Sequence, residues 1–542
     1  MSGRPISRLA WRFGWLPVLW AITASEAMAQ ATPLFKGGAT CTFCHSRRLE
    51  DDVRPFHRDL ILLNEGTILR DLDKHALAYK VLEGPLGQAI GRRLGWKVTE
   101  DQRCLSCHAN LRADVAPVEN FGQVVQEGVG CEACHGPGSL YELLHQRPDW
   151  RTKSPAEKAA LGMVDVRNPI ERVRQCASCH VGDAQQGKVV THEMYAAGHP
   201  PLPPFEAAAF AEQMPRHWRY LCEKGALQNE AKFLEVNFGP QASAARQQLP
   251  VLREVLLGDL MAAISALRLE SKLAEQTDGG LDLVLFDCAA CHHELRYPSW
   301  RQQRGYQGYV PGRPVPADSY LAVVPAVIEV VAKEAGQRDM LLEQWEAMKR
   351  KRLEAFTGRP LGDPAGVATA SSEIADWLEK HLLPLCQSAG ADSLLSEQLL
   401  ARLVDSLHDA QDYASARLLG WTIWALVGEQ AVRYPEAFRN PDPLPAEAEA
   451  LQERVSADLS LWQEYHQQAT ASRQAARQAT LGRAELDRQL ALVLPAGQKV
   501  ELTERLAELL EVSARFDPQR LRQSVGQLRE MLGGSPSAGT SR

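Results

Sequence analysis

The 542-residue sequence predicts an all-α fold built in two parts. In the first part a short motif, C-x-x-C-H, is repeated five times between Cys41 and His292. The second part, residues 316–532, is rich in Leu, Ala, Glu, Gln and Arg, and its segments break at Pro or Gly, which is typical of packed helices. The composition, 45% hydrophobic and 23% charged, excludes wholesale disorder, collagen-like repeats and a polytopic membrane protein.

The first residues have the pattern of an export signal. Three arginines precede an apolar stretch over residues 13–24, which runs into the small-x-small sequence Ala27-Met28-Ala29. This stretch is too short to span a hydrocarbon core of ~30 Å comfortably. We predict a signal peptide over residues 1–29, a periplasmic or otherwise exported protein, and no transmembrane anchor after cleavage. An uncleaved anchor is the alternative.

The repeated motif is the attachment sequence of c-type haem. Its two thiols reach the vinyl groups of one porphyrin, and the histidine that follows becomes the proximal ligand of the iron. The sequence therefore predicts five covalently attached haem c groups. The cysteines are Cys41 and Cys44, Cys104 and Cys107, Cys131 and Cys134, Cys176 and Cys179, and Cys288 and Cys291, and the proximal histidines are His45, His108, His135, His180 and His292.

Two other kinds of site contain paired cysteines, but they do not explain the histidine that follows each pair. Zinc ribbons and dithiol redox sites also use C-x-x-C, but neither requires a histidine directly after the second cysteine. Two further cysteines, Cys222 and Cys386, lie outside the motifs; we expect buried thiols, with a disulfide as the alternative. A net charge of −7 gives no basic footprint, so we predict no nucleic-acid partner.

Two blocks of the chain resemble the tetrahaem cytochrome c family that accepts electrons from hydroxylamine oxidoreductase. They are Asp73-Lys74-His75-Ala76-Leu77-Ala78 and the segment GVGCEACHGPG over residues 128–138. The resemblance implies short helices and loops around stacked haems, with His75 and His145 as distal ligands. It also implies an open distal face at the second haem, whose counterpart here is the haem of His108. The chain differs from the family in its fifth motif, an insert that contains His57, and a long C-terminal region.

The remaining distal ligands are predicted from their local sequence. His199 lies in Ala-Gly-His-Pro, where glycine and proline favour a fixed loop, and His192 precedes it by two helical turns. His57 follows Arg-Pro-Phe. His217 and His293 are left out of the set, His293 because it adjoins a proximal ligand. The predicted distal ligands are thus His57, His75, His145, His192 and His199.

The rest of the chain is predicted from helical periodicity. Residues 251–276 predict one helix with Leu256, Leu260, Ala263 and Leu267 facing the core. A Gly- and Pro-rich segment over residues 305–316 separates a pentahaem cytochrome c domain, residues 30–315, from a helical bundle-like domain, residues 316–532. Helices are expected near residues 319–356, 371–388, 392–409, 412–430, 445–483 and 498–532, and residues 533–542 form a disordered tail.

These features predict a cytochrome that carries electrons between redox protein partners or within a respiratory complex. The alternative is a multihaem oxidoreductase that acts on a small nitrogen or sulfur compound at one five-coordinate haem. A third interpretation is a subunit whose helical C-terminal half docks in a larger assembly. The number of distal ligands distinguishes the first two, because an iron with two histidine ligands has no open position for a substrate.

Overall fold

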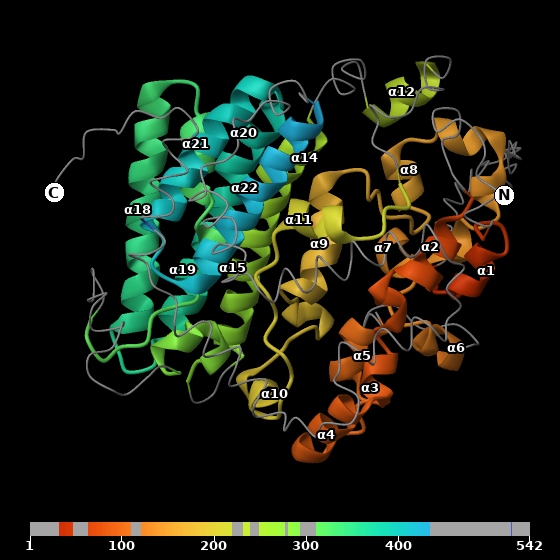
Figure 1. Cartoon of the computed structure of the whole chain (residues 1–542), viewed down its shortest axis with the longest axis horizontal. Coiled ribbons are helices and arrows are strands. Elements are labelled where there is room, and N and C mark those ends of the chain that lie inside the picture. The colour runs from red at the N-terminus through yellow and green to blue at the C-terminus, as the bar shows by residue number, and fades with distance from the viewer. Residues whose placement is uncertain are drawn as a thin grey trace, which may run out of the picture. The chain divides into compact units, whose positions relative to one another are not determined.

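The computed structural model describes residues 32–46, 63–109, 121–218, 231–238, 249–276, 280–292, 310–433 and Arg522. Within these residues every regular element is a helix, and strand pairing is limited to isolated bridges such as that between Asp183 and Lys188 (Figure 1). The predicted all-α fold is confirmed for this part of the chain. Of the helices in these ranges, none is long and apolar enough to cross a membrane.

The first part consists of short helices joined by loops. They are α1 (Gly38–Thr42), α2 (Glu65–Leu72), α3 (Lys80–Glu83), α4 (Pro85–Leu94), α5 (Gln102–His108), α6 (Phe121–Gln126), α7 (Cys131–His135), α8 (Pro155–Ala159), α9 (Pro169–His180), α10 (His192–Ala196), α11 (Ala207–Gln213) and α12 (Ala231–Phe238), with 3-10 turns between several of them. Helices of this length are marginal on their own in water. Their order depends on contacts outside each helix.

Local signals place the ends of these helices. Asn168 accepts a hydrogen bond from the Ile170 amide, and Pro169 occupies the first turn of α9. Ser154 and Glu157 form a reciprocal capping box at the start of α8. Asp101 and Asp287 cap the helical turns of the second and fifth motifs as Asn168 caps α9, so that three of the motif segments are fixed at their N-terminal ends by capping side chains.

The helix predicted over residues 251–276 is present, but it contains a π-helical turn. Residues run from α14 (Pro250–Glu254) through the π-turn (Val255–Asp259) into α15 (Leu260–Glu275). All five residues of the π-turn are buried. Leu256, Leu260, Ala263 and Leu267 face the core, as their spacing predicts.

The C-terminal part contains longer helices. They are η13 (Ser319–Leu321), α17 (Val324–Val331), α18 (Ala335–Thr357), α19 (Pro364–Trp377), a π-turn (Leu378–Leu382), α20 (Leu383–Ser388), α21 (Ser393–Asp409) and α22 (Tyr413–Arg433). The segment expected over residues 319–356 is divided where Ala332 adopts an extended conformation. The segment expected from residue 371 begins earlier, at Pro364 in the first turn of α19. The helices expected over residues 445–532 and the tail lie outside the described residues, apart from helical Arg522.

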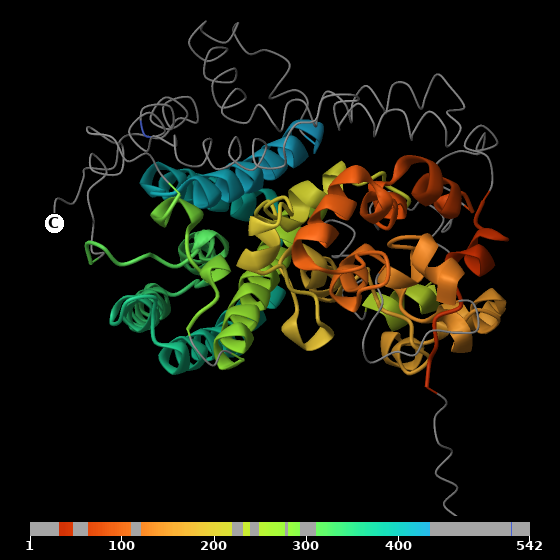
Figure 2. The same ribbon diagram turned by 90° about the horizontal axis from the view of Figure 1, so that it is seen from below.

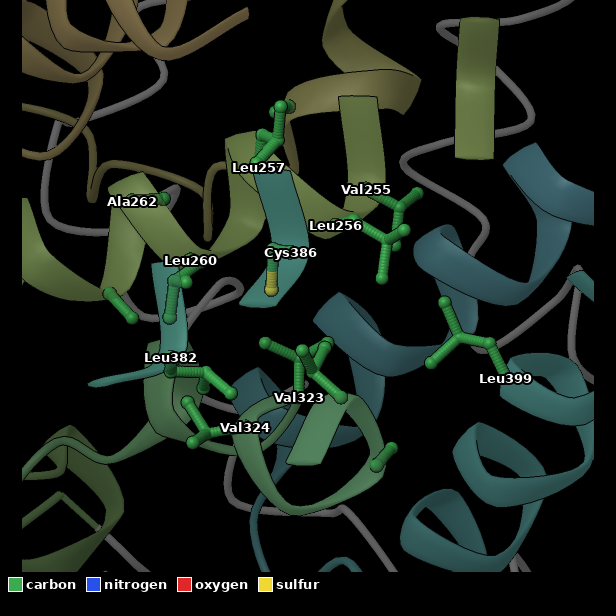
Figure 3. Close-up of a cluster of buried hydrophobic side chains, with 14 of the residues drawn as sticks. Val255, Leu256, Leu257, Leu260, Ala262, Val323, Val324, Leu382, Cys386 and Leu399 are labelled. Carbon is green, nitrogen blue, oxygen red and sulfur yellow. The ribbon is translucent and has the colours of Figure 1, made fainter. Parts of the chain in front are cut away.

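The main hydrophobic core joins the two parts. Helix α15 packs along α19, α18 packs on α19, and α21 packs on α22 (Figures 1 and 2). The same cluster includes Val173 of α9 and Phe205. Figure 3 shows its centre, where Leu256 and Leu260 approach Val324, Leu382 and the buried thiol of Cys386, which is free in this structure. A helix that carries one of the motifs is therefore held directly by the helical core.

Candidate functional site

The five motifs occupy helical turns or helix ends. Helices α5, α7 and α9 each end at the motif histidine, so that its two cysteines lie on the last turns of the helix. In the first motif Cys41 lies in α1, and in the fifth Cys288 begins the 3-10 helix Cys288–Ala290. All ten motif cysteines are free thiols in this structure. On a helical turn, two cysteines separated by two residues can both face one porphyrin edge.

Each motif histidine lies beside a second histidine from a distant part of the chain. The ring centres are 6.0–6.4 Å apart in all five cases. The pairs are His45 with His145, His108 with His199, His135 with His217, His180 with His75, and His292 with His192.

This spacing fits a metal ion held between two imidazoles. Two metal–nitrogen bonds of about 2.0 Å, with about 1.2 Å from each nitrogen to its ring centre, give a separation of about 6.4 Å. The observed separations of 6.0–6.4 Å agree with that value. With two thiols beside each pair, the residues present fit a covalently attached haem with two histidine ligands.

Four of the five predicted distal histidines occur in these pairs, namely His75, His145, His192 and His199. The other, His57, lies outside the described residues. The remaining partner is His217, whose ring is 6.4 Å from that of His135. The sequence offered little to single it out, because Pro215 is the only nearby residue that restricts the backbone.

Hydrogen bonds at Nδ1 set the orientation of several rings. The His45 and His75 rings bond to carboxylates of Glu65 and Asp73 at 2.8 and 2.9 Å, respectively. A carboxylate or carbonyl partner at one ring nitrogen leaves the other free to bind metal, and it also fixes the ring plane. The partners are carbonyl oxygens at three other rings: Ala78 at 2.7 Å for His108, Pro200 at 2.8 Å for His199, and Tyr141 at 3.3 Å for His145.

Burial keeps several of these rings neutral. Loss of solvent lowers the pKa of His135, His180 and His199 to about 4 in each case. At His75 burial acts in the same direction, but the hydrogen bond and charge of Asp73 outweigh it and raise the pKa. A neutral imidazole is the form that binds a metal, so the buried rings need not lose a proton at neutral pH.

The pair formed by His108 and His199 borders a small, partly open cavity. The thiols of Cys104 and Cys107 line it as well. Its other walls are mainly aliphatic, from Leu82, Ile90, Leu94, Val98, Val189, Val190 and Met194. An apolar cavity with two thiols and two facing imidazoles suits the flat, apolar face of a porphyrin.

Contacts between the motifs arrange them in a continuous series. Helix α1 packs on α7, and α7 packs on α9, which places the first motif beside the third and the third beside the fourth. Ser106 of the second motif and Ser178 of the fourth bind the same turn, through Gly187 and Lys188. Helix α10 connects the second and fifth motifs, because the Tyr195 ring lies 6.1 Å from that of His199 and the His192 ring lies 6.4 Å from that of His292. The order in space is therefore first, third, fourth, second and fifth motif.

A tight turn over residues 183–188 lies between the second and fourth motifs. The Ser106 hydroxyl donates to the carbonyl of Gly187 at 3.2 Å, and the Lys188 ammonium donates to the Ser178 hydroxyl at 2.9 Å. Both serines are buried, and the Lys188 side chain is only 1% exposed. The turn thus binds the same position in each motif and fixes the distance between them.

Comparison with known proteins identifies one segment. Residues 71–136 match the family model described as cytochrome c554 and c-prime, and they include His75 and the second and third motifs. Cytochrome c-554 of Nitrosomonas europaea is 20% identical over 174 residues, which cover 30% of this chain and 64% of that protein. The match thus spans less than two thirds of the relative's length. No solved structure matches the chain. The resemblance inferred from the sequence is confirmed for this segment.

Proposed function

We propose that the protein is an electron-transfer cytochrome with five covalently attached haems, since residues 71–136 match the family model described as cytochrome c554 and c-prime. The observation that carries the proposal is the set of five histidine pairs, each beside one C-x-x-C-H motif. When bound, a haem with two histidine ligands supplies one-electron oxidation and reduction without an open coordination position.

The proposed ligand set differs from the sequence prediction at one position. His217, in place of His57, would be the distal ligand of the haem attached at Cys131 and Cys134. His199 would be the distal ligand of the haem attached at Cys104 and Cys107, at the position where the family resemblance implies an open face. A closed second haem favours electron transfer over catalysis in this chain.

The chain's own residues perform three tasks in this proposal. Glu65 and Asp73 hold a proton at Nδ1 of the proximal His45 and the distal His75, which keeps the opposite nitrogen available for the metal. Desolvation lowers the pKa of His135 and His180 to about 4, so both rings stay neutral and able to bind the metal. The turn at residues 183–188 holds two motifs at a fixed distance, so that electron transfer between them does not wait on a conformational change.

The spatial order of the motifs gives the proposed path of the electrons. The first and fifth motifs stand at its two ends, and they contain the motif cysteines that are exposed, Cys44, Cys288 and Cys291. Redox partners would therefore deliver and receive electrons at these ends. We place the protein in the periplasm or another exported compartment, because covalent haem attachment and the N-terminal pattern of residues 1–29 both fit export.

Histidine substitutions test the proposal directly. In His217→Ala, the haem next to His135 loses a ligand, so we expect one new high-spin haem that binds carbon monoxide after reduction. His57→Ala and the control His408→Ala, which changes a histidine at the C-terminal end of α21, should leave the spectrum unaltered.

Two results would contradict this assignment. Carbon monoxide binding by the unaltered reduced protein would indicate an open haem and favour the oxidoreductase alternative. A high-spin signal in His57→Ala, together with none in His217→Ala, would restore His57 as the ligand.

A further inference from the structure

Two carboxyl groups meet in the helical core close to the fourth motif. Glu206 precedes α11 and is fully buried, and Asp259 ends the π-turn and is 3% exposed. Their side chains hydrogen-bond to each other. Such a contact requires a proton on at least one of the two, because two carboxylates offer only acceptors.

Backbone amides fix both carboxyl groups in place. Glu206 accepts hydrogen bonds from the amides of Ala208 and Ala209, at 3.2 and 2.5 Å. Asp259 accepts from the amide of Ala207 at 3.1 Å. The pair therefore joins the first turn of α11 to the π-turn, and neither side chain can turn away from the other without breaking these bonds.

The Thr422 hydroxyl can hydrogen-bond to Asp259 whether Asp259 is ionised or protonated. It lies 3.3 Å from Asp259 Oδ2 and 3.0 Å from the Leu418 carbonyl. A hydroxyl has one hydrogen but can also accept. It can donate to an ionised Asp259, or donate to Leu418 and accept from a protonated Asp259. The site thus accommodates the gain and loss of a proton without repacking.

The ionisable groups around the pair do not neutralise it. On α9, Arg172 is held by both oxygens of Glu254 of α14 and by the carbonyl of Val166. On α22, Arg417 stacks on the Trp421 ring, 4.4 Å from its centre. Desolvation raises the pKa of the partly buried Tyr320 and of the buried Cys386 on α20, so both remain neutral. Burial likewise raises the pKa of Asp259 to about 7, and that of Glu206 higher still.

The pair is connected to a motif histidine by stacked rings. Phe205, the residue before Glu206, stacks on the His180 ring with centres 5.5 Å apart and planes 18° apart. Phe210 of α11 meets the edge of the same ring at 5.2 Å. Because this region is buried, a charge on the carboxyl pair is weakly screened and acts on the iron held at His180.

We propose that Glu206 and Asp259 form a proton-binding site coupled to reduction of the haem held by His180 and His75. This inference rests on the proposed function, since it requires that haem. Reduction adds one electron from the redox partner to the iron and one proton from solvent to the pair. Oxidation releases both. Glu206 keeps its proton throughout, and Asp259 changes state.

Redox titration of the haem-loaded full chain at a series of pH values tests this site. We expect one haem potential to fall as pH rises through neutrality, by up to about 59 mV per pH unit, the value for one proton per electron. Asp259→Asn should remove most of that dependence, as should Glu206→Gln. Glu429→Gln is the matched control, because Glu429 accepts from the amides of Val251 and Leu252 as Glu206 does at α11.

The outcomes separate this inference from the proposed function. A flat potential in the unaltered protein, or a slope that persists in Asp259→Asn, overturns the proton site while the haems remain. Absence of haem absorption would overturn the proposed function itself. If the variants do not fold, the infrared difference between the reduced and oxidised unaltered protein decides: a carboxyl carbonyl band that changes with redox state supports the site, and no such band refutes it.

Discussion

Gly136, directly after the third motif, holds a backbone conformation that other residues rarely adopt. Its φ is +80°, and a Cβ built on it would lie 2.1 Å from the Gly162 carbonyl oxygen. The glycine allows the chain to turn away from His135 while α7 stays close to the loop at Gly162. The close approach of the two backbones, as well as the positive φ, requires glycine here.

We therefore expect Gly136→Ala to lower the free energy of unfolding by on the order of 3 kcal/mol, because backbone strain and a steric clash act together. Denaturant unfolding of the haem-loaded protein and of the variant measures this loss in the free energy of unfolding. Gly95→Ala is the control: φ is +72° there, but a Cβ would have no neighbour within 4 Å. Gly95→Ala should lower the free energy of unfolding by about 1 kcal/mol. An equal loss in both variants would contradict a role for the close contact between the backbones of Gly136 and Gly162.

Asp259 also makes stability depend on pH. Burial raises its pKa from the ordinary value of 3.8 to about 7, so between these values the folded chain retains a proton that the unfolded chain releases. The contribution of Asp259 to the free energy of unfolding therefore falls as pH rises from about 4 to about 7, by a few kcal/mol at most. Thermal unfolding midpoints at several pH values should show this slope reduced in Asp259→Asn. An identical slope in the variant would mean that other groups cause it.

At the scale of single residues, the sequence identifies the cysteines and the histidine of each motif, but it does not identify the second histidine that lies opposite. The motif fixes which cysteines and proximal histidines act, because their spacing is local. Which histidine lies opposite each of them depends on segments far apart in the chain. His217 illustrates this: it pairs with His135 through tertiary packing, which no local pattern encodes.

At the scale of elements, a buried ion pair connects α15 to α18. Arg352 of α18 binds both oxygens of Glu270 on α15, at 2.7 and 2.6 Å, and Asp318 at 2.5 Å. Both Arg352 and Glu270 are buried. Ser371 of α19 also donates to Glu270, so that three helices depend on one carboxylate.

Removal of Arg352 should leave Glu270 buried without its cation. We expect Arg352→Ala to lower the free energy of unfolding by about 3–5 kcal/mol. Lys351→Ala, on the same helix but in an exposed pair with Glu373, should cost about 1 kcal/mol or less. Urea unfolding of both variants compares them. Similar losses would show that the buried network contributes no more than a surface pair.

The sequence predicts helix positions well where the caps and the apolar spacing are local, as for α21 over residues 393–409 and α22 over residues 413–433. It does not predict the π-turn before α15, because that turn depends on how Gly258 and Asp259 contact α9 and α11. A Cβ on Gly258 would lie 2.7 Å from the Ala207 side chain and 3.0 Å from that of Val173. Such contacts form only in the packed tertiary structure, and no periodic pattern in the sequence indicates them.

At the scale of the whole molecule, the number of haems is the decisive quantity. Five complete motifs predict that mass spectrometry of the denatured, haem-loaded protein will show five haem additions. Replacing Cys288 and Cys291 with serine should remove one addition and leave four, because thioether bonds cannot form there. Fewer than five additions in the unaltered protein would contradict the count.

The histidine pairs also bear on how the chain can reach its folded state. Each pair joins residues roughly a hundred positions apart, and the intervals overlap, since His75, His108 and His135 lie between His45 and its partner. Closing long loops costs conformational entropy before any contact repays it. The first three motif histidines, His45, His108 and His135, find their partners only in later chain, whereas His180 and His292 pair with histidines that precede them. The first haem site therefore stays incomplete until residues beyond the third motif are present, and the sites must be completed together rather than one after another along the chain.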